Sequence, residues 1–205
     1  MITFFDTETT GLVKWDVEDT HPDQPRMVSL GLVLTDDDGR EIFSLGCIIK
    51  PEGFEIPEKA ASIHGITTEM ANHFGLPSKM VLGFFLMCAS QSHTCVAHNY
   101  KFDRTILNRE LFLMTQKINQ EYSPLPDSKS FCTMLAIMNV CRIPGTSKGR
   151  GFKWPKLEEA YRFLFNREME GAHNAMCDVR ATKEIFFEGV RQGHFELKNV
   201  EEFVK

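Results

Sequence analysis

The sequence has little that would take it into or across a membrane. Its 205 residues contain no unbroken apolar stretch long enough to span a bilayer. The first apolar run has no basic leader before it and no small-residue cleavage site after it, so we expect no secretory signal. A membrane is therefore not among the partners that we expect.

The six cysteines lack the spacing of a metal site. They include no C-x-x-C pair, and they are scattered along the chain, mostly in apolar surroundings. This pattern argues against a zinc site and against a disulfide framework. It favours free thiols in a reducing compartment, and we predict a cytoplasmic location.

The chain also lacks an excess of positive charge. Its 23 Lys and Arg residues face 28 Asp and Glu residues, which gives a net charge of -5. This balance disfavours a protein that holds nucleic acid through bulk positive charge alone. It is compatible with an enzyme that holds a phosphodiester through bound metals, because the acidic ligands then add to the negative count.

One basic segment departs from this balance. Residues 142–156, RIPGTSKGRGFKWPK, contain five Lys and Arg residues, no acidic residue, and two interleaved aromatic residues. The segment is either a solvated loop or a surface that binds phosphates and stacks bases. On the second interpretation, Lys148, Arg150 and Trp154 are candidate substrate-binding residues.

The order of the expected elements predicts an α/β domain with a mixed sheet. No repeat, low-complexity tract or linker divides the chain, so we expect a single domain over residues 1–205. An apolar run predicts a strand at about residues 1–7, and two more flank DDDGRE, where Asp-Gly favours a hairpin. After an irregular segment that starts at Pro51, helices and short strands alternate, beginning with a helix for which Ser78 is the candidate cap.

Two carboxylates, one residue apart, end the first strand. In FFDTETTGL, residues 4–12, Asp6 and Glu8 share one face because side chains alternate along a strand. Two such carboxylates repel each other unless positive charge lies between them. Cationic side chains, a shared proton or a divalent metal would supply relief, and a solvent-exposed strand end is the alternative explanation.

Two further acids lie near the starts of expected helices. Asp103 follows a short strand in VAHNYKFDRTIL, and Asp178 begins the last long helix in GAHNAMCDVRAT. Acids at these positions often only complement the helix dipole, but α/β sheets also place their active sites there. His173 precedes Asp178 by five positions, which is about 500° of helical rotation, so it faces the same site only from a loop. Gly171 favours that loop.

Taken together, these motifs resemble the DEDDh family of 3′–5′ exonucleases, which includes the bacterial polymerase proofreading subunit. FDTETTGL resembles the first family motif, HNYKFD the second, and HNAMCD the third, with the histidine spacing of the "h" branch. SIHGIT, residues 62–67, resembles the His-Gly-Ile-Thr segment of the family. The resemblance extends from residue 1 to about residue 190. It implies a ribonuclease H-like α/β fold, with a five-stranded mixed sheet flanked by helices.

The resemblance also implies metal-dependent removal of nucleotides from the 3′ end of single-stranded DNA, with release of 5′-mononucleotides. Asp6, Glu8, Asp103 and Asp178 carry enough negative charge to hold two divalent ions, Mg2+ or Mn2+. His173 would be the general base for the attacking water, because imidazole titrates near neutral pH.

The rest of the first motif suggests contacts with the end of the substrate. The backbone amides of Thr9 and Thr10 are expected to meet the terminal 3′ hydroxyl and phosphate. Gly11 would allow a close approach of the backbone. From the family resemblance, Leu12 is expected to wedge against the terminal bases.

Three positions in the other motifs have narrower expected roles. His64 and Phe102 are candidates to line the base pocket, although a packed core position accounts equally well for Phe102. Asn99 is expected to orient the second motif. We class all three as candidate substrate-binding residues.

Three alternatives are compatible with the same motifs. The first is an exoribonuclease of this family, oligoribonuclease-like or ribonuclease T-like, because stacking and phosphate contacts serve RNA as well as DNA. The second is a non-catalytic binding domain, which the intact set of acids and histidine disfavours. The third is a polymerase-bound proofreading subunit. Only 27 residues follow Asp178, so we favour a stand-alone enzyme, and a polymerase partner and a homodimer are both left open.

Overall fold

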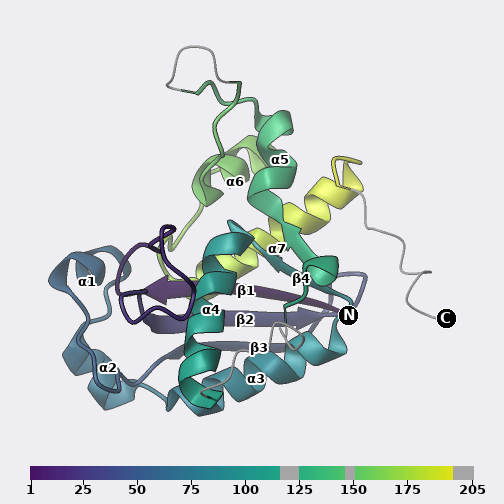
Figure 1. Cartoon of the computed structure of the whole chain (residues 1–205). Coiled ribbons are helices and arrows are strands. Elements are labelled where there is room, and N and C mark those ends of the chain that lie inside the picture. The colour runs from purple at the N-terminus through teal and green to yellow at the C-terminus, as the bar shows by residue number, and fades with distance from the viewer. Residues whose placement is uncertain (116–124, 146–150, 196–205) are drawn as a thin grey trace.

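A five-stranded mixed sheet forms the centre of the molecule (Figure 1). The computed structural model describes residues 1–115, 125–145 and 151–195. The strands are β1 (Ile2–Thr9), β2 (Met27–Thr35), β3 (Glu41–Ile48), β4 (Thr94–Ala97) and β5 (Ser130–Cys132). They lie in the order β3-β2-β1-β4-β5, with β1, β2 and β3 antiparallel and with β4 and β5 parallel to β1. The predicted mixed sheet with three antiparallel strands is confirmed.

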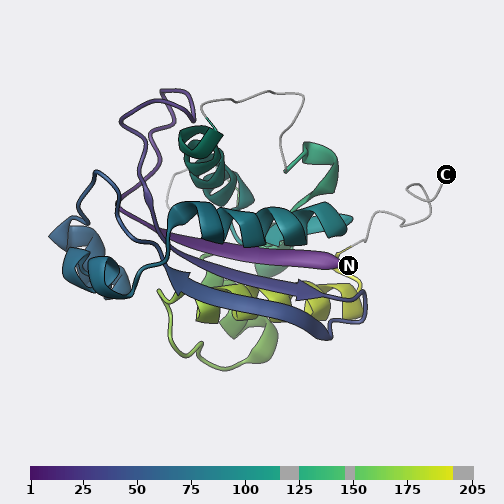
Figure 2. The ribbon, with the colours of Figure 1, turned by 90° about the horizontal axis from the view of Figure 1, so that it is seen from below.

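Helices cover both faces of this sheet (Figure 2). They are α1 (Glu58–His64), α2 (Thr68–Phe74), α3 (Ser78–Gln91), α4 (Tyr100–Thr115), α5 (Thr133–Cys141), α6 (Leu157–Phe165) and α7 (Ala175–Arg191). Helices α3 and α4 lie on one face, and α5, α6 and α7 lie on the other. In the part of the chain described, no helix has both the length and the apolar character needed to span a membrane.

Side chains alternate along β1, so this strand contributes to the hydrophobic core on each face of the sheet. Phe5 faces α3 and α4, where its ring makes edge-to-face contacts with Phe85 and Tyr100. Phe4 points to the opposite face and makes the same kind of contact with Phe186 of α7. Strand β2 is buried along its whole length, which explains why its sequence is a continuous apolar run. The expectation of a single domain over residues 1–205 stays a prediction.

One local prediction from the sequence is wrong, and another is incomplete. The segment after Pro51 contains two short helices, α1 and α2, where the sequence predicts an irregular chain with short helical turns near its end. Ser78 does not cap α3, because Pro77 occupies the cap position and Ser78 is already helical. The Ser78 hydroxyl instead lies 3.5 Å from a carboxylate oxygen of Glu110. A cap depends on the backbone conformation at that position, which the identity of the residue does not fix.

The six cysteines are free thiols, as the sequence predicts. Burial raises the pKa of Cys47 and Cys141 to about 11 and that of Cys95 to about 12. Thiols in this state are poor nucleophiles and poor metal ligands. These three cysteines therefore act as apolar packing groups.

Candidate active site

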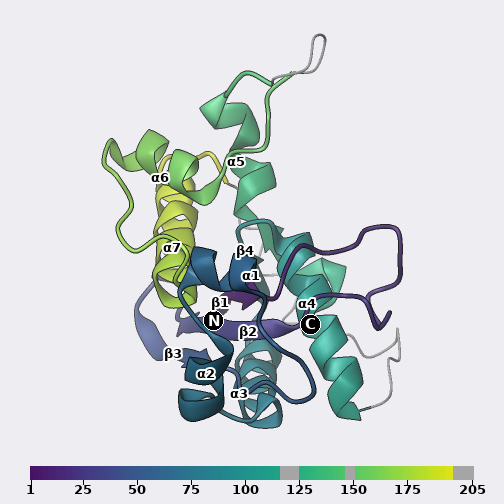
Figure 3. The ribbon, with the colours of Figure 1, turned by 90° about the vertical axis from the view of Figure 1, so that its left-hand side faces the viewer.

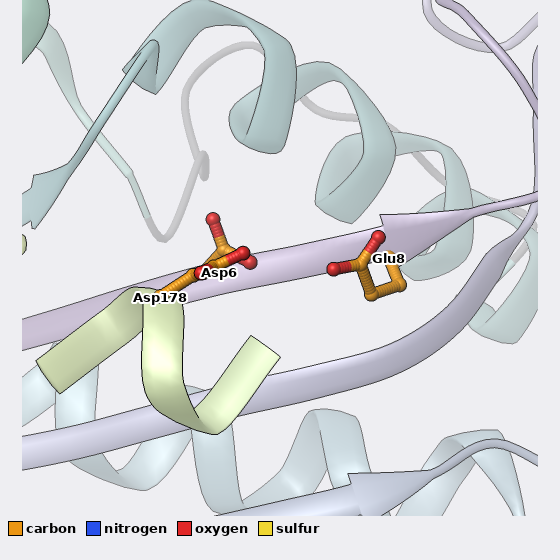
Figure 4. A group of neighbouring side chains, drawn as sticks. All are labelled: Asp6, Glu8 and Asp178. Atoms are coloured by element: carbon orange, nitrogen blue, oxygen red, sulfur yellow. The ribbon is translucent and has the colours of Figure 1, made fainter. Parts of the chain in front are cut away.

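Three of the predicted acids meet at the end of β1 (Figure 4). Asp6 and Glu8 project from β1, and Asp178 projects from the first turn of α7. One carboxylate oxygen from each residue lies within 4.8 Å of the others. Asp178 is buried, and its Oδ1 atom has no hydrogen-bond partner in the described chain. The sequence prediction that these acids share one site agrees with this geometry.

A glycine on β2 allows Asp178 to reach this position. Gly31 pairs with Asp6 across the antiparallel ladder, and α7 begins directly over it. A Cβ atom at Gly31 would lie 2.1 Å from the carbonyl oxygen of Ala175, well inside van der Waals contact. The missing side chain therefore lets the start of α7 rest on the sheet beside Asp6. Sequence reasoning missed this residue, because its partner is far away along the chain.

Asp103 approaches the same strand end from α4. It is buried, and its Oδ1 atom accepts hydrogen bonds from the backbone nitrogen of Thr7 at 3.0 Å and from the Thr7 hydroxyl at 2.8 Å. Asp103 is not in the group of three mutually close acids, but its charge is one of the causes that raise the pKa of Asp6. Thr7 lies between the two acids of the first motif, and it is a second positioning residue that sequence reasoning missed.

All four carboxyl groups have raised pKa values. Burial is the largest cause for each. For Asp6, the charges of Asp103, Asp178 and Glu8 raise the pKa further. The pKa of Glu8 and that of Asp103 rise to about 7, and that of Asp178 rises to about 6 although His173 lowers it. External positive charge would relieve the repulsion in a cluster of this kind and favour its ionised form.

The donor set fits a hard divalent cation. Carboxylate oxygens are the ligands that Mg2+ and Mn2+ prefer, and three of them converge here. The unpartnered Oδ1 of Asp178 is a buried acceptor that a cation would satisfy. The alternative of a solvent-exposed strand end is wrong, because Asp6 and Glu8 are half-buried beside α7.

His173 lies in a loop ahead of α7, as the five-residue spacing requires. Its φ is 64°, Gly171 has a φ of 71°, and Asn174 caps the helix by accepting from the backbone nitrogens of Met176 and Cys177. The backbone nitrogen of His173 donates to Oδ2 of Asp178 at 3.2 Å. The imidazole is 55% exposed, and its Nε2 atom lies 3.9 Å from a carboxylate oxygen of Glu158. The ring therefore stands at the mouth of the acidic site.

His64 lines the same site from the end of α1. A pocket of about 520 Å³ is lined by Glu8, His64 and His173 among others. Burial lowers the pKa of His64, and the neighbouring His173 lowers it further. Its Nδ1 accepts from the backbone nitrogen of Ile66 at 3.1 Å, while its Nε2 is buried without a partner in the described chain. His64 therefore shares a pocket with Glu8, and its predicted place in the base pocket stays a prediction.

The rest of the first motif forms the rim. The Thr9 hydroxyl donates to the carbonyl oxygen of Gly11 at 2.7 Å. The backbone nitrogen of Thr10 donates to the carbonyl oxygen of Arg26 at 3.0 Å. This amide is therefore not free to meet a 3′ end, contrary to the expectation from the sequence. A Cβ at Gly11 would meet nothing within 4 Å, so no internal contact requires glycine there. Leu12 is 85% exposed.

The second motif starts α4 with a strained residue. Asn99 has a φ of 70°, and its carbonyl oxygen accepts from the backbone nitrogen of Phe102 at 2.8 Å. Asn99 thus lies in the turn that begins the helix carrying Asp103, and its role in orienting the second motif stays a prediction. Phe102 is half-buried and packs against the core cluster under α3 and α4, which favours its interpretation as a core residue.

The basic segment is only partly described. Lys148 and Arg150 lie outside the described residues, and Trp154 is exposed. His98 fixes the chain beside Trp154, because its ring nitrogens lie 3.0 Å from the Pro155 carbonyl oxygen and 2.9 Å from the Thr133 hydroxyl. Burial lowers the pKa of His98 to about 4, so this ring is neutral at pH 7. Trp154 is therefore presented from an anchored segment.

Comparisons of sequence and of structure agree on the kind of protein. The family model described as exonuclease matches residues 3–186. An uncharacterized exonuclease of Escherichia phage 186 is 28% identical over 183 residues, which cover 89% of this chain and 84% of that protein.

Solved structures of exonuclease I share the fold. The E. coli enzyme in complex with a dA16 oligonucleotide matches 94% of this chain with a TM-score of 0.70 and 20% identity. The enzyme of Methylocaldum szegediense matches 93% with a TM-score of 0.69 and 20% identity. The present chain spans only about 40% of the length of these proteins. The match over residues 3–186 shows that the chain belongs to the exonuclease family, and the exonuclease I structures show that it has their fold.

Proposed function

We propose that this exonuclease removes nucleotides from the 3′ end of single-stranded DNA and releases 5′-mononucleotides. The observation that carries the proposal is the acidic cluster at the end of β1, where Asp6, Glu8 and Asp178 converge and Asp103 lies alongside. Burial and mutual repulsion leave these groups in need of cations. The phosphate of a scissile linkage is brought to such a cluster only through those cations.

Asp6, Glu8, Asp103 and Asp178 would hold two divalent ions, Mg2+ or Mn2+. When bound, a pair of such ions supplies activation of the attacking water and stabilisation of the leaving oxygen. The exonuclease I of E. coli with single-stranded DNA has been solved in a zinc-bound form, which supports a divalent site without fixing which metal is used. Thr7 holds Asp103 in its ligating orientation through two hydrogen bonds.

His173 takes the proton of the attacking water in this proposal. Its place in a loop lets the imidazole turn over the acids while its backbone stays bonded to Asp178. The Glu158 carboxylate, 3.9 Å from Nε2, stabilises the imidazolium that forms. Asp178 therefore holds the backbone of His173, and Glu158 faces its imidazole ring.

Single-stranded DNA is the proposed substrate, and solved structures of the same fold that hold such DNA support this choice. E. coli exonuclease I has been solved with dA16 and with dT13 oligonucleotides. Leu12 and His64 stand on the rim and in the pocket beside the acids, where a terminal nucleotide would lie, and Trp154 is an exposed aromatic residue available for stacking. RNA is the second candidate, since none of these contacts requires a deoxyribose.

The test is a digestion of end-labelled single-stranded DNA and RNA in parallel, with Mg2+, with Mn2+ and with chelator. DNA shortened from its 3′ end only in the presence of metal is expected. Faster shortening of RNA would replace the proposed substrate by the alternative. Cleavage in chelator would contradict the metal dependence.

The variant His173→Ala tests the role of the general base independently of the acids that would bind the metal. Single-turnover hydrolysis should fall by about 10²–10⁴-fold, because a positioned general base contributes about that much, while binding of single-stranded DNA stays unchanged. His173→Asn should behave in the same way, since its amide does not accept the proton at neutral pH. His73→Ala, on the surface of α2, is the matched control. Wild-type rates in either His173 variant would remove this residue from the mechanism.

We do not extend the proposal to a polymerase partner or a homodimer, because no observation on the described chain argues for either. The cytoplasmic location is also a proposal. It is supported by the six free cysteines, which are typical of a reducing compartment.

A further inference from the structure

The loop between β1 and β2, residues 10–26, presents large apolar side chains to solvent. The Trp15 side chain is 56% exposed, and Leu12 precedes it by three residues. The ring of an exposed tryptophan gains free energy when a partner covers it. From the sequence alone, residues 14–25 are expected to form only a surface loop.

Buried polar contacts hold this loop in one conformation. Gln24 is buried, and its Nε2 donates to the carbonyl oxygens of Lys14 at 2.9 Å and Glu18 at 3.2 Å. Its Oε1 accepts from the backbone nitrogen of Lys14 at 3.1 Å. The residues on either side of Trp15 are therefore fixed from inside the loop.

The same loop is fastened to α4, the helix that carries Asp103. The Asp19 carboxylate accepts from the Thr105 hydroxyl at 3.2 Å and from Nδ2 of Asn108 at 3.0 Å. Arg109, which is buried, donates to the carbonyl oxygen of Thr20. Figures 1 and 3 both place the loop against α4. Trp15 is thus held in a fixed position relative to the acidic site.

A lysine from the first turn of α4 covers the tryptophan ring. The Nζ atom of Lys101 lies 4.8 Å from the ring centroid of Trp15, and Lys101 is two residues before Asp103. A shallow hollow of about 630 Å³ opens beside the ring and is lined by residues of the same loop, which include Trp15, His21 and the acids Asp16 and Glu18. An aromatic face and an ammonium group therefore stand together at the start of α4, the helix that carries Asp103.

We propose that Trp15 is a stacking platform for a nucleobase on the 5′ side of the scissile linkage, and that Lys101 contacts a phosphate of the same strand. The inference rests on the proposed function, because it takes a single strand as the substrate. Aromatic rings stack with every base, and lysine meets phosphate without regard to sequence. The rigid loop lowers the entropy cost of binding, because the platform is already in place.

The test compares an oligonucleotide with a substrate that has no upstream nucleotide, thymidine 5′-monophosphate p-nitrophenyl ester. Trp15→Ala should raise KM for single-stranded DNA roughly 5- to 150-fold, the range of one base–aromatic stack. Its kcat on the oligonucleotide, and both constants on the ester, should stay at wild-type values. Trp15→Phe should recover part of the lost affinity. Phe74→Ala, an exposed aromatic on α2, is the matched control and should change neither substrate.

An oligonucleotide with one abasic position, moved stepwise from the 3′ end, locates the stacked base. One position should raise KM for the wild-type enzyme and have no further effect in Trp15→Ala. Equal losses on the oligonucleotide and the ester would overturn the inference, as would an unchanged KM in Trp15→Ala. A wild-type enzyme that cleaves neither substrate would contradict the proposed function, and the role of Trp15 would fail with it. A wild-type enzyme that cleaves both, with Trp15→Ala equal to it, would contradict the role of Trp15 alone.

Discussion

Two buried acidic regions of this molecule differ in what faces them. Glu110 on α4 is 1% exposed, and its carboxylate accepts from Nε of Arg26 at 2.7 Å, from Nη2 of Arg26 at 3.2 Å and from the backbone nitrogen of Met27 at 3.1 Å. The acids at the end of β1 have each other as neighbours, and their pKa values are raised. The charge of Glu110 is balanced by a residue of the chain, whereas the charges of the acids at the end of β1 repel one another.

The difference separates charges that stabilise the fold from charges that are available to a ligand. The Arg26–Glu110 pair joins the start of β2 to α4, and so fixes the frame on which Asp103 sits. A buried carboxylate that serves architecture needs its partner in the chain, because an unpaired buried charge is costly. The acids at the end of β1 fit the proposed function in the same terms, because bound cations would then be their positive partners.

The largest expected effect is on the incomplete region. Asp6→Asn should reduce turnover by roughly 10³-fold, since charge stabilisation by a bound ion contributes several kcal/mol to the transition state. The measurement is single-turnover hydrolysis across a Mg2+ titration. Asp38→Asn, in the exposed turn between β2 and β3, is the control and should retain full activity. Near-normal hydrolysis by Asp6→Asn at saturating Mg2+ would show that the acids do not hold the metal.

The next effect is on stability, and it comes from breaking the Arg26–Glu110 ion pair. Glu110→Gln should lower the free energy of unfolding by roughly 3 kcal/mol, because it leaves the Arg26 guanidinium partly buried without its carboxylate. Urea denaturation of the metal-free protein measures the loss. The double variant Arg26→Met/Glu110→Met should lose less, since neither charge is then left alone. If Glu110→Gln is as stable as the wild type, Glu110 does not stabilise the fold.

The two regions also differ in how the stability of the protein depends on pH. The acids at the end of β1 have folded pKa values of about 6 to 7, above their unfolded values near 4, so the folded state binds more protons in this range. Stability of the metal-free protein therefore falls as pH rises from about 4 to 7, by on the order of 3 kcal/mol for Asp178 alone.

Urea midpoints in chelator at pH 5 and pH 8 check this sign. Mg2+ should restore stability at pH 8, because it binds the ionised acids of the folded state only. Asp178→Asn should flatten the pH dependence in chelator, and Asp38→Asn should leave it unchanged. Stability that rises between pH 5 and pH 8 in chelator would contradict the raised pKa values.

The sequence predicted the parts of the site that depend on local pattern. Alternation along β1 places Asp6 and Glu8 on one face, and the spacing of His173 from Asp178 requires the loop that the structure contains. The helices and strands that carry the other motifs follow from apolar periodicity in the same way.

The residues that the sequence did not reveal act through partners far along the chain. Thr7 bonds Asp103, which is 96 residues away, and Asp19 bonds Asn108, 89 residues away. These contacts depend on how α4 docks against β1, and no local pattern encodes that docking. The same holds for Lys101 and Trp15, whose contact exists only after the loop has folded onto the helix.

The contact between Gly31 and Ala175 has a consequence for judging relatives of this protein. Any side chain at position 31 would push the start of α7 off the sheet and carry Asp178 away from Asp6. A homologue that keeps all four acids and the histidine, but has a larger residue at this place in β2, would read as active in every motif search and be catalytically silent. Enzymes and silent paralogues in such a family are therefore better separated by the bare backbone under the last helix than by the acids themselves.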